Sequence, residues 1–366
     1  MERPSLLASN RDALRALVER LGGRAFHADI ARREVLANGV LDYAGMTALP
    51  AALRAALAAE VPILSGREVE RRGSNDGTTK LLTAFPRRSA RGDGDTTVET
   101  VHIPRSKAPA SDARALEGEG ASGATLCVSS QAGCPVGCPF CASGLAGLAR
   151  NLEAHEIVEQ YVRGRALGPL GRSVVMGIGE PFLNLANLTA ALAVVADEMG
   201  LGARKLTVST VGFPDRLRRA ARENPRFQLA ISLHTPDQEQ RDELVPAMKG
   251  VPIEDVLAAG DDWFEVTGRE VTYEYVLLGG TNDSLGAAER LAQRLARRRC
   301  SVNLIPYNPS PEMPFARPAA NAADAFRDRL RERGIVATIR WSRGLDGAAA
   351  CGQLRLSRPK GLEAGA

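Results

Sequence analysis

From residue 125 onward, short apolar segments rich in β-branched residues alternate with longer segments of helical periodicity. This alternation is typical of strands joined by crossover helices, and such strands run parallel in one sheet. Six or seven units in one direction favour a full or partial (β/α) barrel over a flat doubly wound sheet. The predicted strands are 125–130, 173–178, 205–210, 227–233, 270–278, 301–307 and 336–342. The predicted helices are 153–167, 185–200, 213–223, 237–247, 252–267, 284–298 and 322–334.

The chain before this alternation has a different character. Residues 1–85 are predicted to form a small, mostly helical N-terminal domain, with short strands and turns over 61–85. A second domain, 98–366, begins with a strand at 98–104 and contains a flexible, Gly-, Ala- and charge-rich insertion at 105–124. The three expected N-terminal helices are 9–22, 27–37 and 50–60.

Charge and hydropathy limit the partners and the compartment only weakly. The formal net charge is +4, a mild basic bias that a polyanionic partner tolerates but does not require. No stretch of about 20 consecutive apolar residues exists that could span a bilayer. The N-terminal segment is charged and amphipathic, without the apolar core of a secretory signal. We therefore expect a cytoplasmic protein that makes no membrane contact.

Three of the six cysteines fall in the motif CPVGCPFC, with Cys134, Cys138 and Cys141 spaced C-x3-C-x2-C. Three thiolates can hold three irons of a cubane cluster and leave the fourth iron open to a small molecule. A structural zinc site would need a fourth ligand, usually from a second cysteine pair, and no such pair follows. Cys127 lies on a predicted strand and is a poor partner for the loop. The sequence therefore predicts a [4Fe-4S] cluster.

Polar residues and glycines follow several later strands, at the barrel end where chemistry is expected. Gly179 permits close backbone approach, and the Glu180 carboxylate can accept a hydrogen bond from an ammonium group. The ordinary alternatives are a turn with a solvent-facing Glu, a structural His and a turn Asn before Pro309. The remaining candidates at strand ends are Ser209, Ser232, Leu233, His234 and Asn308.

The cysteine spacing, with Phe140 before the last cysteine, resembles the radical S-adenosylmethionine (SAM) superfamily. Further segments narrow the resemblance to the RlmN/Cfr family, whose members methylate adenine in 23S rRNA; RlmN also acts on tRNA. The matching segments are CVSSQAGC (127–134), GIGEPFLN (177–184), TVSTVGFP (207–214), ISLHTPDQEQRDELVP (231–246), NLIPYNP (303–309) and AACGQL (349–354). The resemblance implies a partial (β/α) barrel of radical SAM type with a small helical N-terminal domain.

The resemblance also implies the cofactors and their ligands. One [4Fe-4S] cluster would bind Cys134, Cys138 and Cys141, and two SAM molecules would be consumed per turnover. The residues expected to bind SAM are Gly179, Glu180, Ser209, Ser232, Leu233, His234 and Asn308.

Two cysteines outside the cluster motif receive roles from the same resemblance. Carbon 2 or 8 of adenine is not nucleophilic, so a polar methyl transfer from SAM would face a high barrier. In the implied scheme Cys351 carries the methyl group as a nucleophile, and Cys127 attacks Cys351 to form a disulfide and release the product. Glu99 matches the position of the base that removes the ring proton. Cys300 is interpreted as a buried, inert thiol.

The expected reaction is methylation of an adenine carbon, preferably carbon 2, in 23S rRNA and/or tRNA, with flavodoxin or ferredoxin as electron donor. The alternatives are the same chemistry at carbon 8, or on tRNA only, or on a small molecule. A further alternative is a non-catalytic RNA-binding protein with a structural cluster or zinc ion. Arginine-rich helices could touch phosphates or be solvated helix faces; they contain Arg216, Arg218, Arg219, Arg222, Arg294, Arg297, Arg298 and Arg299.

Overall fold

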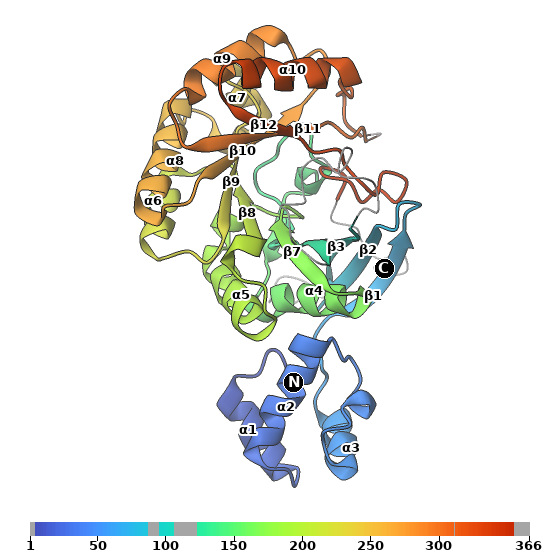
Figure 1. Ribbon diagram of the computed structural model, residues 1–366. Coiled ribbons are helices and arrows are strands. Elements are labelled where there is room, and N and C mark those ends of the chain that lie inside the picture. The colour runs from blue at the N-terminus through green and yellow to red at the C-terminus, as the bar shows by residue number, and fades with distance from the viewer. Residues whose placement is uncertain (1–3, 87–94, 106–122, 311, 355–366) are drawn as a thin grey trace, which may run out of the picture.

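The computed structural model describes residues 4–86, 95–105, 123–310 and 312–354. Its centre is a ten-stranded sheet in the order β1-β2-β3-β4-β7-β8-β9-β10-β11-β12 (Figure 1). From β4 to β12 all neighbours are parallel, and no pairing within the described ranges joins β12 to β1, so the barrel is open. This confirms the predicted partial (β/α) barrel. The parallel strands are β4 (Ala124–Cys127), β7 (Leu170–Val175), β8 (Leu206–Thr210), β9 (Gln228–Ser232), β10 (Val271–Leu277), β11 (Cys300–Pro306) and β12 (Val336–Ile339).

The crossover helices cover the outside of this sheet (Figure 1). In α9 (Leu285–Leu295) the buried side chains recur at steps of one and three residues, which gives one apolar face, and Ser284 caps the first turn by accepting from Ala287 N at 3.2 Å. α4 (Ala154–Leu167) is instead buried on all sides over residues 156–164. Each helix lies where the helical periodicity predicts it. The helices are α4 (Ala154–Leu167), α5 (Leu185–Glu198), α6 (Pro214–Arg222), α7 (Gln238–Leu244), α8 (Ile253–Thr267), α9 (Leu285–Leu295) and α10 (Ala320–Glu332).

Three antiparallel strands extend the sheet beyond β4: β1 (Arg67–Gly73), β2 (Thr79–Phe85) and β3 (Thr96–Ile103). β1 and β2, which lie within the predicted N-terminal range 1–85, therefore pair into the same sheet as the barrel strands. β2 lies between β1 and β3, and all its residues after Thr79 are buried. The predicted insertion at 105–124 lies almost wholly outside the described residues.

The N-terminal helices are α1 (Arg11–Arg20), α2 (Ala25–Asn38) and α3 (Ala51–Glu60), and they form a small unit beside α4 and α5 (Figure 1). Arg32 of α2 donates to both oxygens of Glu198 at 2.7 and 3.0 Å, and Arg165 donates to the carbonyl of Ala37 at 2.8 Å. These contacts hold the unit against the barrel. No helix in the described ranges is long and apolar enough to cross a membrane.

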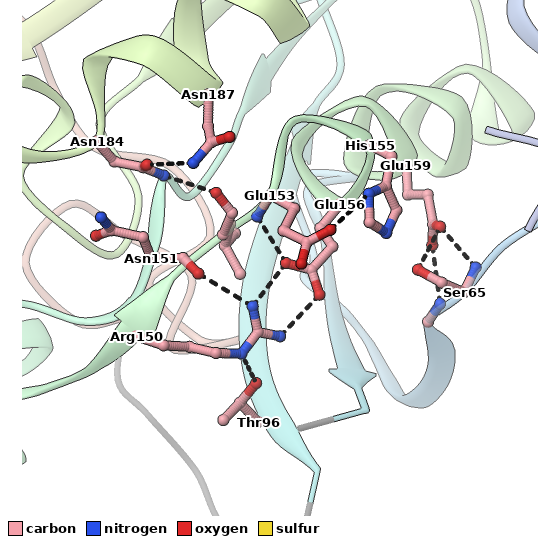
Figure 2. A network of polar contacts seen from close by, with 12 residues as sticks. Ser65, Thr96, Arg150, Asn151, Glu153, His155, Glu156, Glu159, Asn184 and Asn187 are labelled. Carbon is pink, nitrogen blue, oxygen red and sulfur yellow. Dashed lines mark hydrogen bonds and ion pairs between the residues drawn. The ribbon is translucent and has the colours of Figure 1, made fainter. Parts of the chain in front are cut away.

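A buried carboxylate anchors the segment that leads from this unit into β1. Glu159 of α4 accepts from the backbone N and the hydroxyl of Ser65, both at 2.6 Å, and from Gly66 N at 2.9 Å (Figure 2). Burial raises the pKa of Glu159, while these donors oppose that rise. The contact fixes where the chain enters the sheet.

Candidate active site

The cysteine loop lies between two short strands that pair with each other, β5 (Gln131–Gly133) and β6 (Leu148–Asn151). Gly133 has φ +77°, and a Cβ atom there would overlap the carbonyl oxygen of Gly147. Only glycine allows the two strands to approach so closely at the base of the loop. Cys134, Cys138 and Cys141 are thereby held within one compact hairpin.

Polar contacts attach this hairpin to the barrel (Figure 2). Arg150 donates to both carboxylate oxygens of Glu156 at 2.7 Å and to the hydroxyl of Thr96 at 2.9 Å. Asn151 Oδ1 accepts from Gln131 Nε2 at 2.7 Å. Bidentate Arg–carboxylate pairs fix geometry as well as distance, so the base of the cysteine loop is fastened to both α4 and β3.

The three cysteines line a cavity of about 940 Å³, part of it open to solvent, at the carboxyl ends of the parallel strands. Most residues predicted to bind the cofactor line the same cavity, as does Cys351, whereas Leu233, Cys127 and Glu99 do not. Leu233 is fully buried in the core. The predicted residues in the cavity wall are Gly179, Glu180, Ser209, Ser232, His234 and Asn308.

The thiols of the motif sit in an environment that disfavours their charged form. Burial raises the pKa of Cys134 to about 12, and burial and the neighbouring thiols raise the pKa of Cys138 well above its ordinary value. Thiolates here need a cationic partner, which iron would supply. In the described ranges, no group of three His, Cys, Asp or Glu side chains is arranged to hold a single metal ion. Three cysteine thiols on the wall of one cavity instead fit an iron–sulfur cluster.

Glu180 is buried and almost saturated with hydrogen bonds. Its Oε1 accepts from Thr210 Oγ1 at 2.6 Å and Phe182 N at 2.9 Å, and its Oε2 accepts from Val211 N at 2.9 Å. Burial raises the pKa of this carboxyl. Since each carboxylate oxygen can accept two bonds, one lone pair of Oε2 remains for a ligand. Glu180 thus both orders β8's exit loop and can receive one ammonium hydrogen.

Gly179 is required by close packing beneath that carboxylate. Its φ is +113°, and a Cβ atom would lie 2.7 Å from Gln131 Cβ and 2.8 Å from Gln131 N. Any side chain would push the cavity wall away from the cysteine hairpin.

The two predicted serines come together across neighbouring strands, with their hydroxyl oxygens 3.2 Å apart. His234, two residues after Ser232, has a left-handed φ of +65°, which is uncommon for a residue with a side chain. Its Nδ1 accepts from Val276 N at 3.2 Å, and burial lowers its pKa to about 3. The ring is therefore neutral with its hydrogen on Nε2, so it offers one donor.

The segment carrying Cys351 is bound directly to the cysteine hairpin. Ala142 N donates to Gly352 O at 2.8 Å, and Ser143 Oγ donates to Leu354 O at 2.6 Å. Asn308 Nδ2 donates to Cys351 O at 3.1 Å, while Asn308 Oδ1 is buried and has no hydrogen-bond partner among the described residues. Cys351 therefore lies at the cavity, and Asn308 keeps one acceptor for a ligand there.

Cys127 packs against the segment that carries Cys351. It shares a small apolar cluster with Ala349 and Leu354, which flank Cys351. Burial raises the pKa of both thiols, that of Cys351 to about 12, while Arg340 opposes the rise in each. Both cysteines are free thiols. The structure thus brings together two cysteines that lie far apart in the sequence.

Glu99 is buried on β3, outside the cavity wall, and its Oε1 lies 2.8 Å from Lys80 Nζ. It shares this place outside the cavity wall with Cys127 and Leu233. The strand pairing still places it on the sheet face of Cys127, because Val101, two residues along from Glu99, is opposite Cys127.

Sequence reasoning missed Glu274 and Arg340. Glu274 lines the cavity, accepts from Asn303 Nδ2 at 2.9 Å, and burial raises its pKa to about 7 despite nearby Arg340. A charged residue inside the apolar strand VTYEYVLL is the signal that could have revealed it. Arg340 follows the last strand and gives no comparable signal.

The arginine-rich helices are partly committed to ion pairs on the outer surface. Arg218 pairs with Asp262 at 2.7 Å, Arg294 with Glu254 at 2.6 Å, and Arg298 also pairs with Glu254 at 3.1 Å. An arginine held in such an ion pair is less available to contact an RNA phosphate.

Comparison with known proteins agrees with this geometry. The family model "Radical SAM superfamily" matches residues 128–292, which span the cysteine hairpin and the following β/α units. A protein of Nostoc punctiforme named "Probable dual-specificity RNA methyltransferase RlmN" is 39% identical over 97% of this chain and 94% of its own length. A relative of the same name from a Synechococcus strain is 41% identical over 97% of this chain and 99% of its own length. This chain belongs to the RlmN family.

Structural comparison extends the family assignment. The crystal structure of a radical SAM methyltransferase from Sphaerobacter thermophilus superimposes with a TM-score of 0.81 at 39% identity, covering 96% of this chain and 98% of that one. The RlmN family uses a [4Fe-4S] cluster and SAM, and this chain is accordingly a SAM-dependent radical SAM enzyme.

Proposed function

We propose that this chain methylates carbon 2 of an adenine in 23S rRNA and/or tRNA, with the methyl group carried on Cys351. The observation that carries the proposal is the placement of the Cys351 segment. It is bound to the cysteine hairpin through Ala142 and Ser143, and its flanking residues pack against Cys127. A structural cluster or zinc site needs neither cysteine. The relatives' name supports RNA as the substrate.

Cys134, Cys138 and Cys141 would hold the cluster, which supplies an electron to SAM when both are bound. The free lone pair of Glu180 would accept from the SAM ammonium group, while Gly179 lets this wall of the cavity pack closely against Gln131. Ser209 and Ser232 would donate to polar groups of SAM. The remaining polar atoms of the wall, His234 Nε2 and Asn308 Oδ1, supply a donor and an acceptor.

Two SAM molecules are consumed per turnover in this scheme. Cys351, as a thiolate, first takes a methyl group from one SAM, and Arg340 lowers the cost of that charge. After the carbon has been joined to adenine, Glu99 accepts the ring proton. The Cys127 thiolate then attacks Cys351 sulfur, and an S–S bond forms as the bond from Cys351 sulfur to the transferred carbon breaks. The electron pair of the broken bond stays on that carbon, which takes up a proton to become the methyl group. External thiols reduce the disulfide, and flavodoxin or ferredoxin supplies the cluster's electrons.

The test uses the Cys127→Ala variant expressed in cells. Without Cys127 the bond between Cys351 and the substrate carbon cannot be broken, so RNA should remain covalently attached. Mass spectrometry of the joined peptide and nucleotide identifies Cys351, the RNA and the carbon. Cys300→Ala serves as the matched control, because Cys300 does not line the cavity.

Attachment of RNA to Cys351 only in Cys127→Ala supports the proposal. Attachment at carbon 8, or to tRNA alone, would replace the finer assignment. Absence of any adduct while the protein still cleaves SAM would refute the carrier role and favour a small-molecule substrate.

A further inference from the structure

The hairpin formed by β1 and β2 contacts the segment carrying Cys351 at several points. In the turn between these strands, Asp76 Oδ2 accepts from Gly344 N at 2.9 Å, and Asn75 N donates to Asp346 Oδ2 at 2.9 Å. Gly347 packs against Ser74 so closely that a Cβ atom there would overlap the serine hydroxyl. The turn therefore holds the start of the segment that ends at Cys351.

Among the contacts made by this β1–β2 hairpin, that of Lys80 on β2 is the nearest to Cys351 in the sequence. Lys80 Nζ donates to Ala348 O at 2.9 Å and lies 2.8 Å from Glu99 Oε1. Both charged side chains are at least nine-tenths buried, with 9% and 4% exposure. Lys80 on β2 therefore links the Glu99 carboxylate on β3 to the carbonyl of Ala348. These three residues come from separate segments of the chain.

Strand register explains why these groups meet. Lys80 is opposite Val101 and Leu82 is opposite Glu99, so Lys80 and Glu99 are diagonal neighbours on one face. Val101 is in turn opposite Cys127, which places Cys127 on that face too. Ala348 has a left-handed φ of +48°, an uncommon conformation for a residue with a side chain, and the contact with Lys80 helps to hold it.

We propose that Lys80 is a positioning residue that ties the Glu99 carboxylate to the segment carrying Cys351. This inference rests on the proposed function for the roles of Glu99 and Cys351. The contacts of Lys80 with Glu99 and with Ala348, here called the tie, do not depend on that function. The ammonium group, 2.8 Å from Oε1, fixes the direction of the Glu99 carboxylate. Through Ala348 it also fixes the distance between that base and the carbon carried on Cys351. The base and the carrier, which come from different segments, are thereby set relative to one another.

The tie is tested first without reference to activity, by hydrogen exchange of peptides covering 343–354 in the full-length protein with its cluster reconstituted. Lys80→Met should raise exchange in this segment at least ten-fold, whereas Lys80→Arg should keep it close to wild type. Because Lys80→Met removes a cation from beside the buried Glu99 carboxylate, the double variant Lys80→Met/Glu99→Gln repeats the measurement with the charge of Glu99 removed as well. Unchanged exchange in both Met variants would overturn the tie.

The positioning role is tested by turnover on RNA. In Lys80→Met, kcat should fall about 100-fold, the loss expected when a reacting group is misplaced by about 1 Å. The KM for SAM should stay within about two-fold, since Lys80 does not line the cavity. Lys80→Arg should recover most of kcat. Unchanged kcat in Lys80→Met despite faster exchange would overturn the role.

Asp76→Ala is the matched control, because it loosens the same segment at Gly344 without touching Glu99. Its kcat should fall less than ten-fold. An equal loss in Asp76→Ala and Lys80→Met would show that holding the segment suffices and would overturn the link to Glu99. If wild type methylates no RNA, the proposed function fails, while the exchange measurement still decides the tie.

Discussion

The cysteine hairpin and the Cys351 segment reach the same cavity by different means. The hairpin is built from one continuous stretch, closed by β5 and β6 and fastened by Arg150, Glu156 and Asn151. The Cys351 segment has no strand or helix of its own and is held by contacts to the hairpin and to the β1–β2 turn. The first site is rigid through local contacts, whereas the second depends on partners distant in sequence. Loss of a local contact should affect the cluster, and loss of a distant one should affect transfer.

The largest effect is expected from the cluster motif itself. Cys138→Ser replaces a soft thiolate with a hard hydroxyl and should remove cluster assembly and all detectable methylation. The fold should persist, because the side chain lines a cavity wall rather than filling the core. Iron content and the visible absorbance of the reconstituted protein measure the loss. Cys300→Ser should bind iron normally; equal iron in both variants would remove Cys138 from the ligand set.

Glu180→Gln should reduce SAM affinity roughly ten- to hundred-fold, the range of about 1.5–3 kcal/mol for a hydrogen bond to a charged group. The amide keeps the shape but replaces one acceptor oxygen with a donor opposite Thr210 or Val211. Equilibrium dialysis with SAM measures it. Iron content serves as the control and should not change; unchanged SAM binding would show that Glu180 serves the loop alone.

Arg150→Ala tests how the cysteine hairpin is anchored to the barrel. It leaves Glu156, whose side chain is only 6% exposed, without its bidentate partner. Loss of such a partly buried pair should lower the free energy of unfolding by about 2–4 kcal/mol. The rate of iron loss to a chelator should rise, while hydrogen exchange in 343–354 should not. Equal loosening of both segments would contradict their separate anchoring.

The smallest effect concerns pH. Burial raises the pKa of Glu274 from 4.5 to about 7, so its contribution favours the folded state below pH 4.5 and is lost as the pH rises through 7. Glu274→Gln should therefore remove a decline in stability of about 1–3 kcal/mol between pH 5 and pH 7. Urea unfolding at several pH values measures it. A wild type that becomes more stable over this range, relative to the variant, would contradict the assignment.

The same contrast explains what the sequence could predict. Strands and helices of the barrel follow from periodicity, and Cys134, Cys138 and Cys141 follow from spacing, since both signals are local. The positions of Glu180, Ser209 and His234 follow from the rule that parallel strands end at one edge. Lys80 and Arg340 carry no clear local signal, and Glu274 carries only that of one charged residue inside an apolar strand. Their roles depend on strand register and on where Ala348 comes to lie, and both are set by long-range packing.

The assignment of β1 and β2 shows the same limit. Their sequence reads as strands, but nothing local indicates which sheet they join. Pairing of β2 with β3 decides this, through contacts across a stretch that includes residues outside the described ranges. The sequence therefore does not reveal that the hairpin formed by β1 and β2 contacts Gly344 and Ala348.

The most direct test of the meeting of Cys127 and Cys351 is disulfide mapping after a single turnover in the absence of added thiol. The wild-type protein is incubated with RNA, SAM and a reductant for the cluster alone, then alkylated, digested and analysed by mass spectrometry. The account predicts a peptide joined through Cys127 and Cys351, in an amount equal to the methylated adenine formed. Methylated adenine that accumulates while both cysteines are recovered as alkylated thiols would contradict it.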